Sequence, residues 1–248
     1  FWSSPAALPD IRLRFEGVEY DLVFVMTPAV ALAWLIGWAR RISKRSYAYI
    51  TDFFPFHHAS IGLVPRGLPM RLALFAETRL FRTFDTLAVM SPMGETYLRA
   101  RYTLAPDQHI QVLPLWTGTA AHTAPPPADV RRKFGLPLDK HIALFGGQIT
   151  DGKGIEDILA AAALARQSDP DILFLLIGKG RLEHLVQDYI AGGGSNVRLQ
   201  PFLPSRTDFL DLISSCDMGL VATVPNVDVP TFPSKSLDYL AVGLPVVA

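Results

Sequence analysis

One cysteine and a net charge of zero are the first features of this chain, and each excludes a class of function. Among its 248 residues, Cys216 is the only thiol, which excludes a disulfide within the chain and a multi-cysteine metal site. Lysine plus arginine and aspartate plus glutamate number 23 each, so the sequence carries no electrostatic footprint for nucleic acid. We expect Cys216 to be a small core residue, and we expect no secretory signal, since no basic segment precedes an apolar one.

Several common binding signatures are also missing. Neither the P-loop order G-x-x-x-x-G-K-[ST] nor the dinucleotide pattern G-x-G-x-x-G occurs in the chain. The segment from Asp169 to Asp171 has the D-x-D form of some metal sites, yet it precedes an expected strand and so falls at the opposite edge of the sheet from the glycine loops. We interpret it as a turn and expect no metal and no cofactor.

The longest uncharged run covers residues 22–39, and its length narrowly fits a membrane span. Thr27 and Pro28 interrupt it, so we expect a fully buried strand at 22–26 and then a helix at 29–43.

That helix carries two tryptophans, Trp34 and Trp38, one turn apart. Four basic residues follow them: Arg40, Arg41, Lys44 and Arg45. Aromatic and basic side chains in this order suit the surface of an anionic bilayer, which predicts peripheral association with a membrane. The alternative is a core helix with a solvated basic end.

Strand and helix signals alternate along the whole chain, the pattern of parallel sheets with helices on both faces. Expected strands lie at 21–26, 47–50, 86–90, 110–113, 141–147, 172–177, 197–199 and 218–222. Expected helices lie at 29–43, 68–82, 92–102, 181–191 and 206–215, with another from 155 onwards. A proline-rich break between Pro114 and Pro137 predicts two Rossmann-like domains, 1–116 and 117–248.

The last 17 residues, 232–248, read as a loop, a short helix and the beginning of a strand. Pro233 suits a first helical turn because it lacks the N–H that such a turn leaves unpaired, and Thr231 or Ser234 could cap the helix. Gly243 is the expected left-handed stop.

A helix that begins there would direct free N–H groups toward phosphate, with Lys235 as a mobile cation. Asp238 follows Ser234 by one turn, so its carboxylate would lie on the same face, within reach of a ribose or sugar hydroxyl. The alternative is an ordinary capped helix with solvated charges.

Two glycine loops follow expected strands in the same half of the chain. The first, 146–154, would let the backbone approach a ligand while Lys153 reaches a diphosphate; the second is 178–180. In one parallel sheet both loops and the helix at Pro233 would meet at the carboxyl edge of the strands. This convergence indicates a ligand site.

These segments resemble the donor-binding domain of GT-B-fold glycosyltransferases, the retaining group called family 4. Residues 147–155, 177–180 and 232–247 occupy the places of its G-R-L-x-x-x-K-G-I, G-x-G and E-G-F-G to P-V-V motifs in order. The first half is similar more loosely, at 20–28, 52–55 and 112–118. The resemblance implies an α/β fold of GT-B architecture, with two Rossmann-like domains facing a cleft, and a chain truncated at both ends.

Carried over by position, the resemblance implies that Lys153 binds the donor diphosphate, Asp238 the ribose, and backbone at Ser234 and Lys235 the phosphates. The other implied donor-binding positions are Gly147, Gln148, Gly154, Gly178, Gly180 and Pro233.

Two positions depart from the family pattern. Its arginine is Gln148 here, and its first glutamate, which contacts the transferred sugar, is Pro230. We hypothesise that Lys235 restores the missing charge and that Asp228 supplies the lost carboxylate.

Catalysis in this family needs no side-chain nucleophile, because positioning and stabilisation of the leaving diphosphate carry the reaction. His57 and His58 are the remaining candidates for chemistry, holding a sugar hydroxyl or the acceptor; a structural role is the alternative. The resemblance implies a UDP-sugar donor and a glycan or polyprenyl-linked acceptor in surface-polysaccharide synthesis, in the cytoplasm or at the inner face of the membrane. Two alternatives stay open: a degenerate relative that binds nucleotide sugar without transfer, and a UDP-sugar epimerase using acids such as Asp52 or Glu77.

Overall fold

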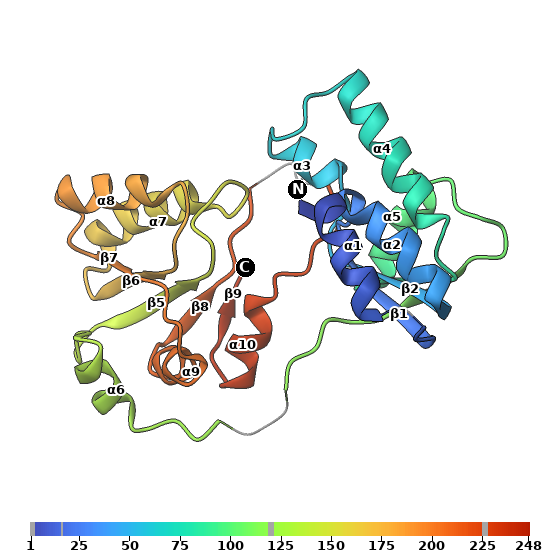
Figure 1. Ribbon diagram of the computed structural model, residues 1–248. Helices are drawn as coiled ribbons and strands as arrows, with labels where there is room; N and C mark the ends of the chain where they lie inside the picture. The colour runs from blue at the N-terminus through green and yellow to red at the C-terminus, as the bar shows by residue number, and fades with distance from the viewer. Residues whose placement is uncertain (1–2, 16, 119–121, 225–227) are drawn as a thin grey trace. The chain divides into compact units, whose positions relative to one another are not determined.

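The computed structural model describes residues 3–15, 17–118, 122–224 and 228–248. They form two compact units, Phe1–Leu115 with Val227–Phe232, and Trp116–Asn226 with Pro233–Ala248 (Figure 1). Each unit is built on a parallel sheet, as the alternating pattern predicts.

The first unit has a four-stranded parallel sheet in the order β1-β2-β3-β4. Its strands are β1 (Tyr20–Thr27), β2 (Ser43–Ile50), β3 (Thr86–Val89) and β4 (His109–Val112). Its helices are α1 (Ser3–Phe15), α2 (Ala33–Ala39), α3 (Phe56–Ser60), α4 (Leu68–Phe81) and α5 (Pro92–Arg101), with short 3₁₀ turns η1 (Val30–Leu32) and η2 (Arg40–Ile42). Neither α1 nor α3 was predicted from the sequence.

The expected helix at 29–43 is wrong in its extent. The structure divides this segment into η1, α2 and η2, and Ser43 already begins β2. The hydroxyl of Ser43 donates to the carbonyl of Ala39 at 2.8 Å, which satisfies one of the carbonyls left unpaired where the helix ends. Lys44 and Arg45 therefore belong to a strand. No helix in the described part of the chain has the length and apolar character needed to traverse a bilayer.

The expectation that residues 22–26 form a fully buried strand is also wrong. β1 lies at the edge of the sheet, where Leu22, Phe24 and Met26 are exposed while Val23 and Val25 turn toward the core. The alternation arises because successive side chains of a strand point to opposite faces, and here a helical layer covers only one of them at this edge.

The core of the first unit contains side chains from the sheet and from α4 and α5, including Phe81, Leu87, Val89 and Leu98. Val229 joins this core although it is more than a hundred residues away along the chain. The segment Val227–Phe232, which we call the return segment, therefore belongs to the first unit.

The second unit has a five-stranded parallel sheet in the order β7-β6-β5-β8-β9. Its strands are β5 (His141–Gly146), β6 (Ile172–Ile177), β7 (Val197–Gln200), β8 (Met218–Leu220) and β9 (Val246–Val247). Its helices are α6 (Pro127–Lys133), α7 (Ile155–Ser168), α8 (Glu183–Ala191), α9 (Arg206–Ser214) and α10 (Lys235–Ala241).

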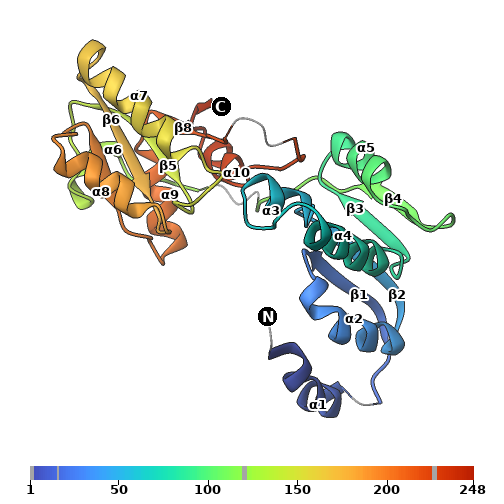
Figure 2. The same ribbon diagram turned by 90° about the horizontal axis from the view of Figure 1, so that it is seen from above.

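Helices cover both faces of this sheet (Figure 2). One core contains α7 and α8 side chains such as Ile158 and Val186; the other contains α9 and α10 side chains such as Leu212 and Tyr239. Cys216 is buried in the second of these, as expected, and its burial raises the pKa of the thiol to about 12. Because β5 and β6 pair in parallel, their carboxyl ends lie at one edge of the sheet.

Candidate functional site

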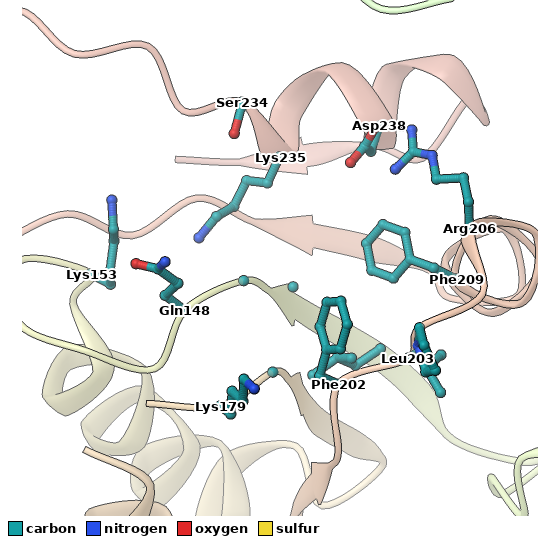
Figure 3. Close-up of a pocket in the computed structure, with 15 residues that line it drawn as sticks. Gln148, Lys153, Lys179, Phe202, Leu203, Arg206, Phe209, Ser234, Lys235 and Asp238 are labelled. Atoms are coloured by element: carbon teal, nitrogen blue, oxygen red, sulfur yellow. Dashed lines mark hydrogen bonds and ion pairs between the residues drawn. The ribbon is translucent and has the colours of Figure 1, made fainter. Parts of the chain in front are cut away.

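A pocket of about 660 Å³ opens at the carboxyl ends of β5 and β6 in the second unit (Figure 3). Its floor is the glycine turn that follows each strand, and its far wall is the beginning of α10. Seven of the predicted donor-binding residues line it: Gly147, Gln148, Lys153, Gly178, Ser234, Lys235 and Asp238. The sequence motifs therefore meet in one cavity.

The floor is closely packed because the two turns touch through their backbones. A Cβ placed on Gly178, whose φ is +148°, would lie 1.8 Å from the carbonyl oxygen of Gly147. Only glycine permits this approach.

Gly154, Gly180 and Pro233 do not line the pocket, although the resemblance places them there. Gly154 begins α7 with a φ of +59°, and a Cβ on it would lie 2.8 Å from that of Ala222. Gly180 borders a neighbouring cavity with Gln148 and Glu183. Gly154 thus permits close approach between the beginning of α7 and the loop after β8, beside the pocket.

Lys235, at the beginning of α10, reaches into the pocket (Figure 3). Its Nζ lies 3.5 Å from the centroid of the Phe145 ring, close enough for a cation–π interaction. Burial, and secondly the charge of Lys153, lower the pKa of Lys235 to about 7. An anionic ligand beside Lys235 would stabilise the charged ammonium group and so raise its pKa.

The predicted cap of this helix is wrong. α10 begins at Lys235, and Ser234 makes no side-chain capping bond. The N–H of Ser236 donates instead to the carbonyl of Pro233 at 2.9 Å, so the first turn closes through its backbone. The helix ends as expected, with Gly243 at a φ of +74°.

The other end of the pocket is an ion pair set among apolar side chains. The guanidinium of Arg206 pairs with the carboxylate of Asp238 and lies 5.8 Å from the Phe209 ring. Phe202 and Leu203, which follow β7, complete this end (Figure 3). The hydrogen bond to Asp238 raises the pKa of Arg206. Sequence reasoning missed Arg206, Phe202 and Phe209; only their position after an expected strand could have indicated them.

Comparison with known proteins assigns this part of the chain to a family. Residues 128–248 match the family model described as Glycosyl transferases group 1. The chain is also 30% identical over 215 residues to WcaI of Escherichia coli, which is named as a colanic acid biosynthesis glycosyl transferase. That match covers 83% of this chain and 51% of WcaI. Residues 128–248 form a group 1 glycosyl transferase domain. The chain spans about half the length of the curated relatives it matches.

Solved structures place the group 1 domain and the first unit in one fold. Sucrose-phosphate synthase from Thermosynechococcus elongatus aligns with a TM-score of 0.72 at 21% identity, covering 98% of this chain and 59% of that one. HepE of Anabaena in complex with UDP and glucose aligns with a TM-score of 0.70 at 19% identity, covering 98% and 62%. The likeness confirms the expected α/β class and GT-B architecture.

The three predicted catalytic residues lie in the first unit. His57 and His58 are on α3, where the His58 ring stands edge-on to Phe54 at 5.1 Å. Asp228 lies in the return segment, 3.4 Å from the guanidinium of Arg101. The sequence assigned Asp228 to the donor-binding half, whereas the structure gives it a partner in the first unit. None of the three lines the pocket.

Glu77 and Tyr102 form a buried pair in the first unit. The Tyr102 Oη lies 2.6 Å from Glu77 Oε2 and 2.7 Å from the carbonyl oxygen of Phe54. Since a carbonyl can only accept, both contacts are satisfied when Tyr102 donates to Phe54 and a protonated Glu77 donates to Tyr102. Burial raises the pKa of Glu77 to about 8, in agreement. Glu77 is a fully enclosed acid, which does not suit the catalytic acid of an epimerase.

The D-x-D segment behaves as a turn. Asp171 precedes β6 and pairs with Lys140 at 2.7 Å. Within the described ranges, no three His, Cys, Asp or Glu side chains gather as a possible metal site.

Proposed function

We propose that the protein transfers a sugar from a nucleoside diphosphate, UDP in the first instance, to a glycan or polyprenyl-linked acceptor in cell-surface polysaccharide synthesis. The transfer retains anomeric configuration and follows the family 4 pattern. We also propose that it acts at the cytoplasmic membrane face. The proposed donors are hexosyl and N-acetylhexosaminyl nucleotides, because residues 233–235, Pro-Ser-Lys, resemble the form of the last motif in the subgroup that uses N-acetylated sugars.

The observation that carries this proposal is the polarity of the pocket. Lys153, Gln148 and Lys235 lie at one end, whereas Asp238, Phe209 and Phe202 lie at the other (Figure 3). A nucleoside diphosphate has the same division: a charged diphosphate, a ribose that offers hydroxyls, and a flat base whose faces stack on aromatic side chains. The volume of about 660 Å³ lies within the range of small-molecule sites.

The residues divide the work by their chemistry. Lys153 and Lys235 neutralise the diphosphate and stabilise it as it leaves, which is the step that needs charge. Gln148 donates a neutral hydrogen bond where the family has an arginine. Asp238, oriented by Arg206, accepts from the ribose hydroxyls. No side-chain nucleophile is required, because the pocket positions the donor and the acceptor attacks it.

UDP is favoured as the donor nucleotide because related structures contain it. HepE is described in complex with UDP, with UDP-glucose, and with UDP and glucose. WcaI is named for colanic acid biosynthesis and WaaG, another structural neighbour, for lipopolysaccharide biosynthesis. These names support an acceptor on the pathway to a surface polysaccharide.

Binding of UDP, GDP and dTDP by calorimetry tests the donor, with Lys235→Ala and Lys153→Ala as variants. We expect UDP to bind tightest and each variant to weaken it about tenfold or more, because each removes a charge-assisted contact to phosphate. Lys140→Ala, at the opposite edge of the same sheet, is the matched control. Unchanged UDP affinity in Lys235→Ala would show that Lys235 does not replace the missing arginine.

The alternative is a relative that binds nucleotide sugar without transferring it, and Gln148 and Pro230 favour it. The two are separated by incubating the full-length protein with labelled UDP-sugars and a membrane extract as the acceptor source. Release of UDP together with labelled glycan supports transfer. Tight UDP binding with neither product supports the non-catalytic alternative.

A further inference from the structure

The solvent face of α4 carries large apolar side chains that no element of the first unit covers. Leu68, Leu72 and Phe75 are 68%, 59% and 67% exposed. Their spacing of four and three residues places them on one side of the 14-residue helix. Leu80 and Phe81 turn the other way and are buried in the core. A surface helix with this pattern normally has a partner for its outer face.

Arginines share this outer face. Arg71, Arg79 and Arg82 continue the same helical spacing, and Arg66 precedes the helix; all four are exposed. Between residues 61 and 83 the only acidic residue is Glu77, which is fully buried. In the described part of the chain none of the four arginines forms an ion pair. The face is therefore strongly basic on a chain whose net charge is zero.

A cavity of about 650 Å³ lies where the apolar and basic parts meet. Two arginines, three threonines and one phenylalanine line it: Arg79, Arg82, Thr78, Thr83, Thr103 and Phe75. The Thr83 hydroxyl already donates to the carbonyl of Leu80, so the two guanidinium groups and the other hydroxyls are the available donors. No carboxylate lines this cavity, which suits a phosphate group.

We propose that this face of α4 docks on the surface of an anionic phospholipid bilayer. Leu68, Leu72 and Phe75 enter the boundary between headgroups and acyl chains, and Arg79 and Arg82 bind a lipid phosphate. A free phosphate would account for the cavity but not for the exposed apolar side chains beside it. The inference does not depend on the donor chemistry of the second unit.

The surface differs from the one that the sequence suggested around Trp34. Trp38 packs against Phe15 with ring centroids 6.4 Å apart, and Lys44 is paired with Asp21 at 2.9 Å. Trp34 itself is exposed, whereas Lys44 and Arg45 lie on β2. Lys44 and Arg45 thus do not extend the helical face that carries Trp34, whereas Arg40 and Arg41 follow α2 directly on η2.

Co-sedimentation with vesicles tests the proposal, using phosphatidylcholine alone and phosphatidylcholine mixed with phosphatidylglycerol. We expect binding to the mixed vesicles only, and weaker binding as salt rises. Arg79→Gln with Arg82→Gln lowers the partition coefficient about 25-fold, at roughly fivefold for each arginine. Leu72→Ser with Phe75→Ser lowers it at least about tenfold, because the inserted apolar area is lost.

Two matched controls make the outcome decisive. Leu164→Ser changes an equally exposed leucine in the second unit and leaves binding unchanged. Trp34→Ser with Arg41→Gln changes the other candidate surface and also leaves it unchanged. The proposal is overturned if neutral vesicles bind equally well, if only the Trp34 and Arg41 variant loses binding, or if inorganic phosphate releases the protein while the Leu72 and Phe75 variant binds normally. The last result would indicate a phosphate site without a bilayer.

Discussion

The ammonium group of Lys235 lies 3.5 Å from the centre of the Phe145 ring, inside a pocket that also contains Lys153. The ring face stabilises the cation, but burial and the second lysine oppose it and hold the pKa of Lys235 at about 7. A group with this pKa changes charge near neutral pH. Lys235 therefore links ligand binding to protonation.

We expect the affinity for UDP to fall as pH rises above 7. The diphosphate stabilises the charged lysine, so binding raises its pKa and takes up a proton at pH values above 7. Below that pH Lys235 contributes its full share to the affinity for UDP. Above it, the affinity falls by at most about tenfold for each pH unit. Calorimetry from about pH 6 to pH 9 measures this slope, and buffers of different ionisation enthalpy count the proton.

Lys235→Arg is the matched variant for that experiment. Arginine stays charged throughout this range, so the variant should bind UDP with a smaller pH slope. Titration of the nucleotide's own phosphate is common to both proteins and cancels in the comparison. Equal slopes would mean that Lys235 is not the group that takes up the proton.

The ion pair between Arg206 and Asp238 predicts coupled effects on nucleotide binding. Arg206 fixes the carboxylate that we assign to the ribose, so Arg206→Gln and Asp238→Asn should each weaken UDP binding about five- to tenfold. The double variant should be little weaker than either single one, because both changes disable the same contact. Additive losses would show that the two side chains bind separate parts of the ligand. Lys133→Gln, which breaks the nearby exposed pair with Asp208, is the control.

Gly178→Ala should destabilise the second unit and abolish the pocket. The new Cβ would lie 1.8 Å from the carbonyl oxygen of Gly147, so the two turns must separate. We expect a loss of about 3 kcal/mol or more in the free energy of unfolding, measured by urea titration, and no measurable UDP binding. Gly118→Ala is the control, since nothing lies within 4 Å of its added Cβ. Normal UDP affinity in Gly178→Ala would contradict the role of this close turn.

The second unit could be predicted well because its elements are specified locally. The runs that form β5 and β6 are continuously apolar and end in glycine, and α7 repeats Ile155, Ile158 and Ala162 at helical spacing. Each signal lies within a few residues of the element that it specifies. The resemblance to the family motifs then identified which loops form the site, and seven of the donor-binding positions it implied line one pocket.

Relationships between distant residues could not be predicted. Burial of β1 depends on its position at the edge of the sheet, which its own sequence does not encode. Val229 enters a core formed by residues far earlier in the chain. Arg206 meets Asp238 only because α9 and α10 lie on the same face of the second sheet. Each of these depends on tertiary packing rather than on periodicity.

Protonation of Glu77 predicts how the stability of the first unit depends on pH. Its pKa of about 8 lies above the unfolded value of 4.5, so the native state binds the extra proton between these limits. The contribution of protonated Glu77 to the free energy of unfolding is therefore fully present below about pH 4.5. It declines toward pH 8 by at most roughly 1.4 kcal/mol for each pH unit. Glu77→Gln keeps a donor for Tyr102 and removes the titration. The variant should match the wild type near pH 5 and be the more stable of the two at pH 8.

Hydrogen exchange of the β2 and β3 amides measures this in the first unit alone, which avoids assuming that both units unfold together. Glu19→Gln, at an exposed position of the same unit, should leave the pH dependence unchanged. If protection in wild type and Glu77→Gln falls in parallel between pH 5 and pH 8, then Glu77 is ionised in the native core. Tyr102 would in that case donate to Glu77, and the Phe54 carbonyl would lose its hydrogen-bond donor. The arrangement deduced from the two short contacts would then be wrong.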